Sequence, residues 1–373
     1  MYCQIFKWGL LTMLKENQIV IYGAQAIAYS TYKAMAKRGK DTLAFVVTKK
    51  EGNPERLDGI PVLSMREFFS KSQDNKKLPI YIATPESVQS EISNILKTAG
   101  CLRIECLTSE RFGALLEAFF ADTSEFMPLI QAETQDDMSN AVSIAEMICI
   151  YQAVHEKDRQ LARDYVNDSW VKPIQVGAAL AGQRFDDMLH DDAGKNISAK
   201  NRAYAELTAL YWAWHNSPAQ VIGLAHYRRL LDINASQLRL LQANKLDAIL
   251  PYPMSYFPQS GMHHKRWVRD EDWEAIMRAM REIYPEYAKA VPNIFAGEYF
   301  YNYNLLCARR EVMDAYCSWL FAICDRAQRY IGSKEPSAMY KYFGYGGESL
   351  CDIFFMYNKD KYRLAHTAAL MRI

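Results

Sequence analysis

The chain has 373 residues, which is more than one hydrophobic core usually organises, so the sequence predicts two domains. Its 44 lysines and arginines nearly balance its 43 aspartates and glutamates, and no overall basic field points to nucleic acid or to an anionic membrane. The eight cysteines lie singly, several of them in apolar segments, and we expect reduced thiols in a cytoplasmic protein.

The first third of the chain alternates between strand and helix patterns. Residues 1–15 hold an apolar segment too short to span a membrane, which we interpret as a leader. Residues 16–122 then contain short apolar runs, separated by stretches with helical spacing that end at glycine. The expected strands are 18–23, 42–48 and 79–84, and the expected helices are 26–39 and 86–100. This order predicts a Rossmann-like domain with a parallel sheet.

A dinucleotide site in this domain is disfavoured. It would need G-x-G-x-x-G, and the segment "YGAQAIA" keeps only Gly23. The second strand ends in Thr48, Lys49 and Lys50, where an NAD site would carry an acid. We therefore favour a degenerate domain that serves regulation, oligomerisation or docking over an NAD(P)-dependent sugar oxidoreductase. The segments "YGAQAIA", "DGIPVL" and "YIATPE" resemble small N-terminal domains of bacterial sugar-modifying enzymes, some of which hold a sugar nucleotide.

A polar, acidic stretch at 123–145 is interpreted as a linker, and a second α/β domain follows at 146–373. Its expected strands are 147–154, 220–229, 246–253 and 298–309, and its expected helices are 199–216, 272–290 and 310–331. Residues 344–357 are expected to form a glycine turn that leads into a final helix.

Polar clusters follow the strands of this second domain, where α/β proteins bind their ligands. His155 and Lys157 come after the first strand, and the segment "HYRR" (226–229) ends the central one. Strand alternation predicts His226 and Arg228 on one face, with Tyr227 and Arg229 on the other. Arginine binds phosphate through two parallel hydrogen bonds, and histidine can donate to it or take a proton. The alternative is a scaffold in which the arginines pair with carboxylates: Asp232, Asp191 or Glu206.

A second candidate cluster is the loop "HDDAGKN" (190–196). Asp191 and Asp192 could hold a divalent metal and Asn196 a sugar hydroxyl, while an Asx-rich turn that caps the next helix is equally compatible. Adjacent aspartates do not face one side as a D-x-D pair does, and the adjacent His263 and His264 lack zinc spacing. We assign no metal ligand.

Two glutamates stand out. Glu206 lies in the helix 199–216 on an otherwise apolar face, so it needs a partner, and we expect an arginine of the "HYRR" segment. Glu206 and Arg229 would then support the site. Glu348 is expected at a helix start after the glycine turn and is the candidate general base. The alternative is a charge that interacts with the helix dipole.

Several long segments in order resemble a known family. They are 173–180, 191–216, 221–231 and 298–321. They are similar to a bacterial glycosyltransferase family of capsule, exopolysaccharide and O-antigen gene clusters, formerly described only as a domain of unknown function. The resemblance covers roughly residues 146–360 and implies a GT-A-like fold. It also implies a nucleotide-sugar-dependent hexosyltransferase, and some members transfer galactofuranose.

The resemblance also implies roles for the residues. Where GT-A enzymes carry a metal-binding D-x-D, this chain has "HYR" (226–228), so cationic side chains could neutralise the donor diphosphate and make Mn²⁺ or Mg²⁺ dispensable. Glu348 and His226 would be catalytic, and His263, His264 and Arg266 would contact the acceptor. The donor-binding residues would be His155, Lys157, Asp191, Asp192, Asn196, His226 and Arg228.

The expected partners are a UDP-sugar and a lipid-linked oligosaccharide, with no nucleic acid. We expect a cytoplasmic enzyme with peripheral contact at the inner face of the cell membrane. The main alternative is a scaffold that binds a sugar nucleotide without turnover.

Overall fold

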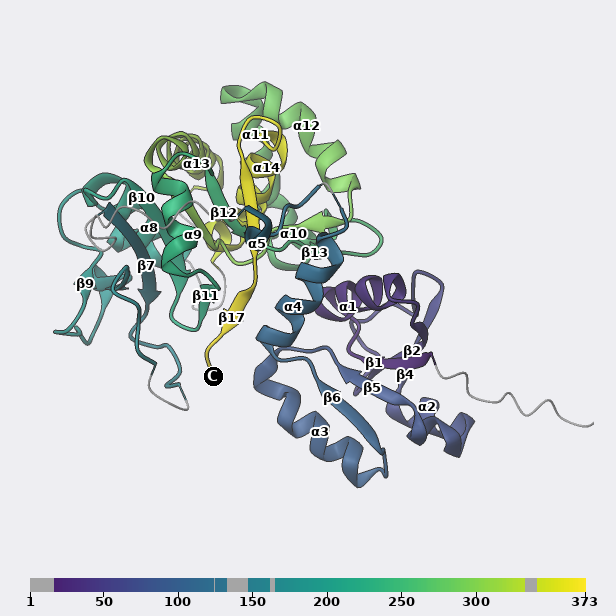
Figure 1. Ribbon diagram of the computed structural model, residues 1–373. Coiled ribbons are helices and arrows are strands. Elements are labelled where there is room, and N and C mark those ends of the chain that lie inside the picture. Colours follow the sequence, from purple (N-terminus) through teal and green to yellow (C-terminus); the bar gives the residue numbers. More distant parts are fainter. Residues whose placement is uncertain (1–16, 124, 133–146, 162–164, 333–340) are drawn as a thin grey trace, which may run out of the picture. The chain divides into compact units, whose positions relative to one another are not determined.

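A computed structural model describes residues 17–123, 125–132, 147–161, 165–332 and 341–373. The chain divides into two compact units, Met1–Cys106 and Leu107–Ile373 (Figure 1). The expected leader lies outside the described residues, as does most of the expected linker.

The boundary between the units falls earlier than residue 122, where the sequence placed it. Helix α4 (Ser109–Phe120) belongs to the second unit, because its buried Phe120 joins the core of that unit and stacks 5.7 Å from the ring of Tyr252. The backbone of Met371 also donates to Ser109 Oγ over 2.9 Å. An amphipathic helix goes to the unit that buries its apolar face, and local pattern does not reveal which unit that is.

The first unit contains a six-stranded sheet in the order β3-β4-β2-β1-β5-β6, counted over its described residues. All neighbours pair in parallel except β3 and β4. The strands are β1 (Gln18–Tyr22), β2 (Asp41–Val47), β3 (Arg56–Leu57), β4 (Ile60–Ser64), β5 (Pro79–Ile82) and β6 (Arg103–Cys106). The helices are α1 (Ala26–Lys37), α2 (Met65–Lys71) and α3 (Gln89–Thr98). The predicted Rossmann-like parallel sheet is confirmed.

Gly23 follows β1 at a point where the backbone is crowded. Its φ is +124°, and a Cβ there would lie 2.6 Å from the carbonyl oxygen of Ala83. Glycine is therefore required at this position by the close approach of the chain after β5. Its presence needs no phosphate ligand to explain it.

The second unit is built on a sheet whose described strands number nine, with the main path β16-β12-β15-β10-β7-β8-β9. Strands β10, β7, β8 and β9 run parallel, and β15 is antiparallel to β10 and β12. Its strands are β7 (Ile148–Val154), β8 (Val171–Gln175), β9 (Leu189–His190), β10 (Val221–His226), β11 (Arg229–Leu231), β12 (Ala248–Pro251), β15 (Leu306–Arg309), β16 (Leu364–Thr367) and β17 (Ala369–Met371). Two short strands, β13 (Met254–Ser255) and β14 (Tyr299–Phe300), form a separate pair.

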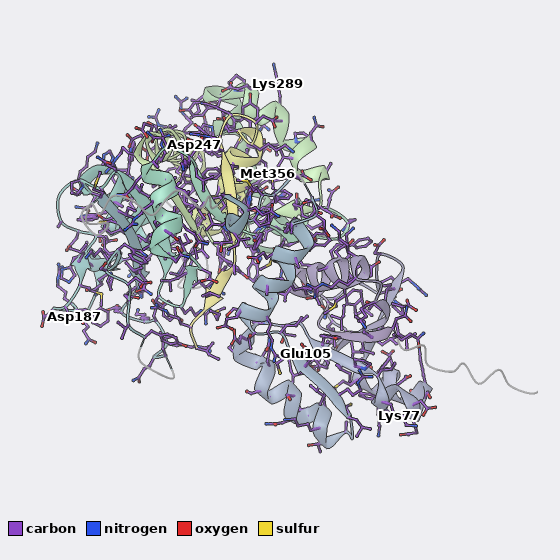
Figure 2. All side chains as sticks on the ribbon, in the orientation of Figure 1. Lys77, Glu105, Asp187, Asp247, Lys289 and Met356 are labelled. Carbon is purple, nitrogen blue, oxygen red and sulfur yellow. The ribbon has the colours of Figure 1, made fainter. Side chains whose placement is uncertain are left out.

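The sheet of the second unit is buried on both faces. In β10, Ile222 and Leu224 face a core shared with α8 (Leu207–Asn216) and α13 (Arg310–Ile331), while Val221 and Ala225 face α9 (Ala235–Gln242). Strand residues alternate between faces, so a strand covered by helices on both sides is apolar throughout. This explains why "VIGLA" has no polar position before His226. Asp247, labelled in Figure 2, accepts hydrogen bonds from Arg309 and Arg363 beside β12.

Three elements of this unit differ from expectation. The helix expected at 199–216 is broken into α7 (Asn201–Tyr204) and α8, and that expected at 272–290 is two helices, α11 (Asp270–Ile283) and α12 (Pro285–Ala296). The strand expected at 298–309 is interrupted between β14 and β15.

The expected glycine turn is helical. The glycines lie inside α14 (Tyr342–Tyr357). A Cβ atom on Gly344, Gly346 or Gly347 would come within 3.0 Å of Ala205, Ile276 or Leu207, respectively. These glycines allow close helix packing rather than a turn.

Helix α13 matches its expected range, and the described cysteines are free thiols. Among the described residues, no helix is both long and apolar enough to cross a membrane.

Candidate active site

A cavity of about 280 Å³ opens in the second unit beyond the carboxyl ends of β7, β8 and β10. Ala153, Val176 and His226 line it at the ends of these strands. Its charged or titratable lining comes from four separate segments: His155, Asp158, Glu206, His226, Arg228, Arg229, Lys341 and Glu348. A concave site at this edge with convergent polar groups is where an α/β domain binds its ligand.

The "HYRR" segment forms a hairpin. Strand β10 ends at His226, Tyr227 and Arg228 make the turn, and Arg229 begins β11 opposite His226. Gln152 of β7 holds the turn by donating to the carbonyl oxygen of Tyr227 over 3.0 Å. The expected strand alternation is therefore wrong, because the strand does not continue, and all four side chains line the cavity.

Arg228 and Arg229 have no carboxylate partner among the described residues. The Nε atom of each is buried and makes no hydrogen bond there. The guanidinium carbon of Arg229 lies 4.3 Å from the centre of the Tyr303 ring, in a cation–π contact. The scaffold alternative required arginine–carboxylate pairs, and the described residues show none for Arg228 or Arg229. Each of these side chains keeps at least one donor, Nε, that no described residue uses.

Glu206 has partners other than the expected arginine. It lies at the break between α7 and α8, where its Oε1 accepts a hydrogen bond from Asn304 Nδ2 over 2.6 Å. His226 Nε2 is 3.8 Å from the same oxygen and 2.6 Å from the carbonyl oxygen of Tyr303. Since a carbonyl only accepts, Nε2 carries a hydrogen, and the other ring nitrogen of His226 is the one that can take up a proton. Glu206 supports His226.

Backbone strain gathers around this network. Ala205, Tyr303 and Asn304 have φ angles of +50°, +79° and +49°. Such angles cost non-glycine residues about 1–3 kcal/mol each and are retained mainly at functional sites. Here they turn the chain so that Glu206 and Asn304, from distant segments, meet beside the cavity.

Glu348 lies in the second turn of α14, and its Oε2 is 3.1 Å from Nε2 of the buried His263. The dipole interaction is confined to the first turn of a helix, so this alternative for Glu348 does not hold. Its side chain is 14% exposed and lines the cavity, where a carboxylate can reach a ligand hydroxyl.

The histidines expected at the acceptor belong instead to a short helix, α10 (Met262–Trp267). His263 stacks on Phe300 and holds Glu348, and His264 stacks between Trp273 and Phe295. Burial lowers the pKa of His264 to about 4. Both imidazoles are therefore buried, and neither is exposed to solvent. The guanidinium of Arg266 lies 5.1 Å from the centre of the Trp267 ring.

His155, Asp158 and Lys341 also line the cavity. Asp158 accepts a hydrogen bond from the backbone N–H of His155 over 2.7 Å, and burial raises the pKa of its carboxyl. Burial lowers the pKa of the His155 imidazole, whose Nδ1 accepts from the backbone of Lys157. The side chain of Lys157 is 80% exposed and does not line the cavity, so its expected donor contact is not found.

The loop "HDDAGKN" is structural. Asp191 is fully buried, and its carboxylate accepts from the backbone of Gly177 and Ala178 and from Ser198. Asp192 forms a bidentate pair with Arg184 at 2.6 and 3.0 Å.

Asn196 closes the same loop. It donates to the carbonyl oxygens of Asp192 and Gly194 and accepts from the backbone of Ser198. Asp191, Asp192 and Asn196 do not line the cavity, and their polar groups are used by hydrogen bonds to neighbouring segments and to the loop itself, so their expected contacts with the donor are not found.

A GT-A-like fold suggests a divalent cation, and the residues present do not fit one. Within the described part of the chain, no three His, Cys, Asp or Glu side chains are grouped to hold a metal ion. Arginine stands in the cavity at the place where the acidic motif was expected, and a guanidinium repels a cation.

Residues 149–359 match the family model described as Domain of unknown function (DUF4422). The chain belongs to this family. Among solved structures, the DUF4422 chain is similar to the WbbM bifunctional glycosyltransferase in its apo form, with a TM-score of 0.52 and 24% identity. The likeness covers 61% of this chain and 45% of that one, so the chain spans less than half of that protein. No curated protein matches. The likeness shows that this chain shares an α/β fold with that glycosyltransferase.

Sequence reasoning missed several cavity residues of the DUF4422 domain. Asp158 directly follows the predicted residues His155 and Lys157 and could have been included with them. No sequence pattern marks Lys341. Asn304 does not line the cavity but donates a hydrogen bond to Glu206 beside it. It carried a signal, because asparagine tolerates a positive φ and interrupts an apolar strand pattern there. His155, His226, Arg228 and Glu348 were predicted, and the structure places them together in the cavity.

Proposed function

We propose that this DUF4422 protein is a glycosyltransferase that uses a UDP-linked sugar as donor. The acceptor is a lipid-linked oligosaccharide in the synthesis of capsule, exopolysaccharide or O-antigen. One observation carries the proposal: a strand-end cavity combines two arginines that have no carboxylate partner in the described part of the chain with a glutamate held by a buried histidine. The arginines match an anionic leaving group, and the glutamate matches a hydroxyl that must lose its proton.

The donor diphosphate is assigned to the hairpin. Arg228 and Arg229 offer planar N–H groups that bind phosphate oxygens in pairs, and His226 adds a third polar group at the strand end. His155 and Lys341 also line the cavity, and we assign the nucleoside to them by analogy with the fold. The family resemblance makes UDP-galactofuranose the first donor to test.

The reaction is a single displacement. The acceptor hydroxyl oxygen forms a bond to the anomeric carbon as the bond from that carbon to the diphosphate oxygen breaks. The hydroxyl proton passes to the Glu348 carboxylate, and the electron pair of the broken bond leaves with UDP. Arg228, Arg229 and His226 stabilise the charge that develops on the leaving diphosphate. Since these groups are cationic or hydrogen-bond donors, no step of this mechanism uses a metal ion.

The acceptor enters beside α10 in this proposal. Lys265 and Arg266 are the cations of this helix, because His263 and His264 are buried. They are suited to the phosphate of a lipid carrier, and they would bring the enzyme to the inner face of the cell membrane.

Glu348→Gln tests the mechanism. We expect UDP affinity to remain close to that of the wild type in calorimetry, while transfer from a panel of UDP-sugars falls by about 10²–10⁴-fold, the usual contribution of a general base. Glu274→Gln, on the exposed surface of α11, is the matched control and should transfer normally. Assays with and without EDTA should agree.

Two results would contradict the proposal in different ways. Absence of UDP binding and of transfer from every donor would remove the glycosyltransferase assignment. UDP-sugar binding without turnover, unchanged by Glu348→Gln, would instead support the non-catalytic scaffold.

A further inference from the structure

Helices α10 and α14 meet through two pairs of side chains. His263 contacts Glu348 at 3.1 Å, and the ring of Trp267 stacks on that of Tyr345, with centroids 5.4 Å apart and planes 20° apart. His263 and Trp267 are four residues apart on one helix, and Tyr345 and Glu348 are three apart on the other. These spacings place each pair of residues on one helix face. The aromatic pair is therefore the direct neighbour of the candidate base.

Trp267 is unusually open for so large an apolar side chain. It is 42% exposed, although its ring is held on one side by Tyr345 and approached by the Arg266 guanidinium. Tyr345 lines the cavity, and Trp267 continues the aromatic surface outside it. A fixed, exposed ring beside a polar cavity offers a flat apolar face whose side chain loses little conformational entropy on binding.

The position of this surface selects its ligand. The hairpin arginines account for the donor diphosphate, and Glu348 must contact the hydroxyl of the acceptor. Whatever lies on the Tyr345 side of Glu348 is consequently the acceptor sugar or its neighbour in the chain. Sugar rings present a face of C–H groups that packs on aromatic rings, while their hydroxyls stay at the edge and remain hydrated.

We propose that Trp267 and Tyr345 form a binding platform for a neutral carbohydrate ring of the acceptor. The inference rests on the proposed function and adds to it the acceptor subsite and the chemistry that recognises it. Trp267 binds the C–H face of the ring, and the Tyr345–Glu348 spacing directs one ring hydroxyl toward the carboxylate.

Saturation-transfer NMR with octyl galactopyranoside and octyl glucopyranoside tests the platform, with and without UDP. Wild-type protein should transfer saturation to the C–H protons of the sugar ring, Trp267→Ala should lose this transfer, and Trp267→Phe should retain it. Tyr357→Ala is the matched control, because Tyr357 is 41% exposed and also packs against a neighbouring ring, that of Tyr287, at the other end of α14. Octyl tetraethylene glycol reports on binding of the alkyl chain alone.

With a glycoside that serves as acceptor, Trp267→Ala should raise its KM about tenfold or more, the usual loss for a central tryptophan, and leave the KM of the donor unchanged. The platform is refuted if Trp267→Ala keeps transfer to the sugar ring, or if only the alkyl chain is saturated. It is also refuted if the variant loses UDP affinity instead, since the ring would then bind the nucleobase. A wild type that binds glycosides but never UDP would refute the proposed function and leave the platform standing.

Discussion

Replacement of Arg228 by methionine should change stability and ligand binding in opposite directions. Methionine keeps an unbranched stem and deletes the guanidinium. In the protein without ligand, Arg228 Nε is a buried donor with no hydrogen-bond partner, and the guanidinium has no carboxylate near it among the described residues. A catalytic or binding site commonly retains such a group at the expense of stability.

The size of each effect follows from these contacts. A buried, unsatisfied donor costs about 1–3 kcal/mol, and since only Nε is buried and unpaired we expect the Met variant to be more stable by up to about 1 kcal/mol. Hydrogen bonds from a charged donor to phosphate contribute about 1.5–3 kcal/mol, so UDP affinity should fall about 10- to 150-fold.

Denaturant unfolding and calorimetric titration with UDP measure the two quantities. Arg184→Met is the control, because Arg184 is bound to Asp192 outside the cavity. Loss of this solvent-screened surface pair should lower stability only slightly and leave UDP affinity unchanged. An Arg228→Met protein that is less stable than the wild type and binds UDP equally well would show a structural role and refute the reasoning.

Two further predictions concern buried ionisable groups. Folding lowers the pKa of His264 from 6.5 to about 4, so the unfolded chain binds more protons and stability falls as the pH drops through this range. Compared with pH 8, the loss at pH 5 is at most about 2 kcal/mol. His264→Phe keeps a ring between Trp273 and Phe295 and should reduce the loss of stability between pH 8 and pH 5, measured by denaturant unfolding. An equal loss of stability in the wild type and the variant would contradict this prediction. Burial raises the pKa of Asp352 well above 3.8, so its contribution to stability is lost as the pH rises above that value. Asp352→Asn should be more stable than the wild type at pH 7 and should lose this advantage near pH 4. A variant that is less stable than the wild type at both pH values would show that the hydrogen bond from the Tyr301 N–H to Asp352 dominates.

Elements that depend on local pattern were predicted well. Strands β1, β2 and β7 and helix α13 lie close to their expected ranges, because apolar periodicity records which faces of an element are buried. The apolar run before His226 predicted that this residue lies at the end of a strand. The α/β class and the parallel first sheet also followed from the alternation of these elements.

What periodicity does not record is which distant groups meet. Glu206 was expected to pair with an arginine, yet its partner Asn304 lies 98 residues away and reaches it only because the backbone is strained at both places. The glycines of α14 predicted a turn, yet they lie inside the helix, where their lack of a Cβ lets Ala205, Ile276 and Leu207 approach closely.

The sequence by itself determined the strand and helix pattern and the polar residues carried to the strand ends, since both depend on neighbours along the chain. The tertiary structure decided which of those residues remain available. Asp191 accepts hydrogen bonds from the backbone that follows β8, at Gly177 and Ala178, whereas the Nε atoms of Arg228 and Arg229 have no hydrogen-bond partner among the described residues. A polar side chain contributes to a site only if folding leaves its hydrogen-bonding groups unused, and packing across the whole domain sets that condition.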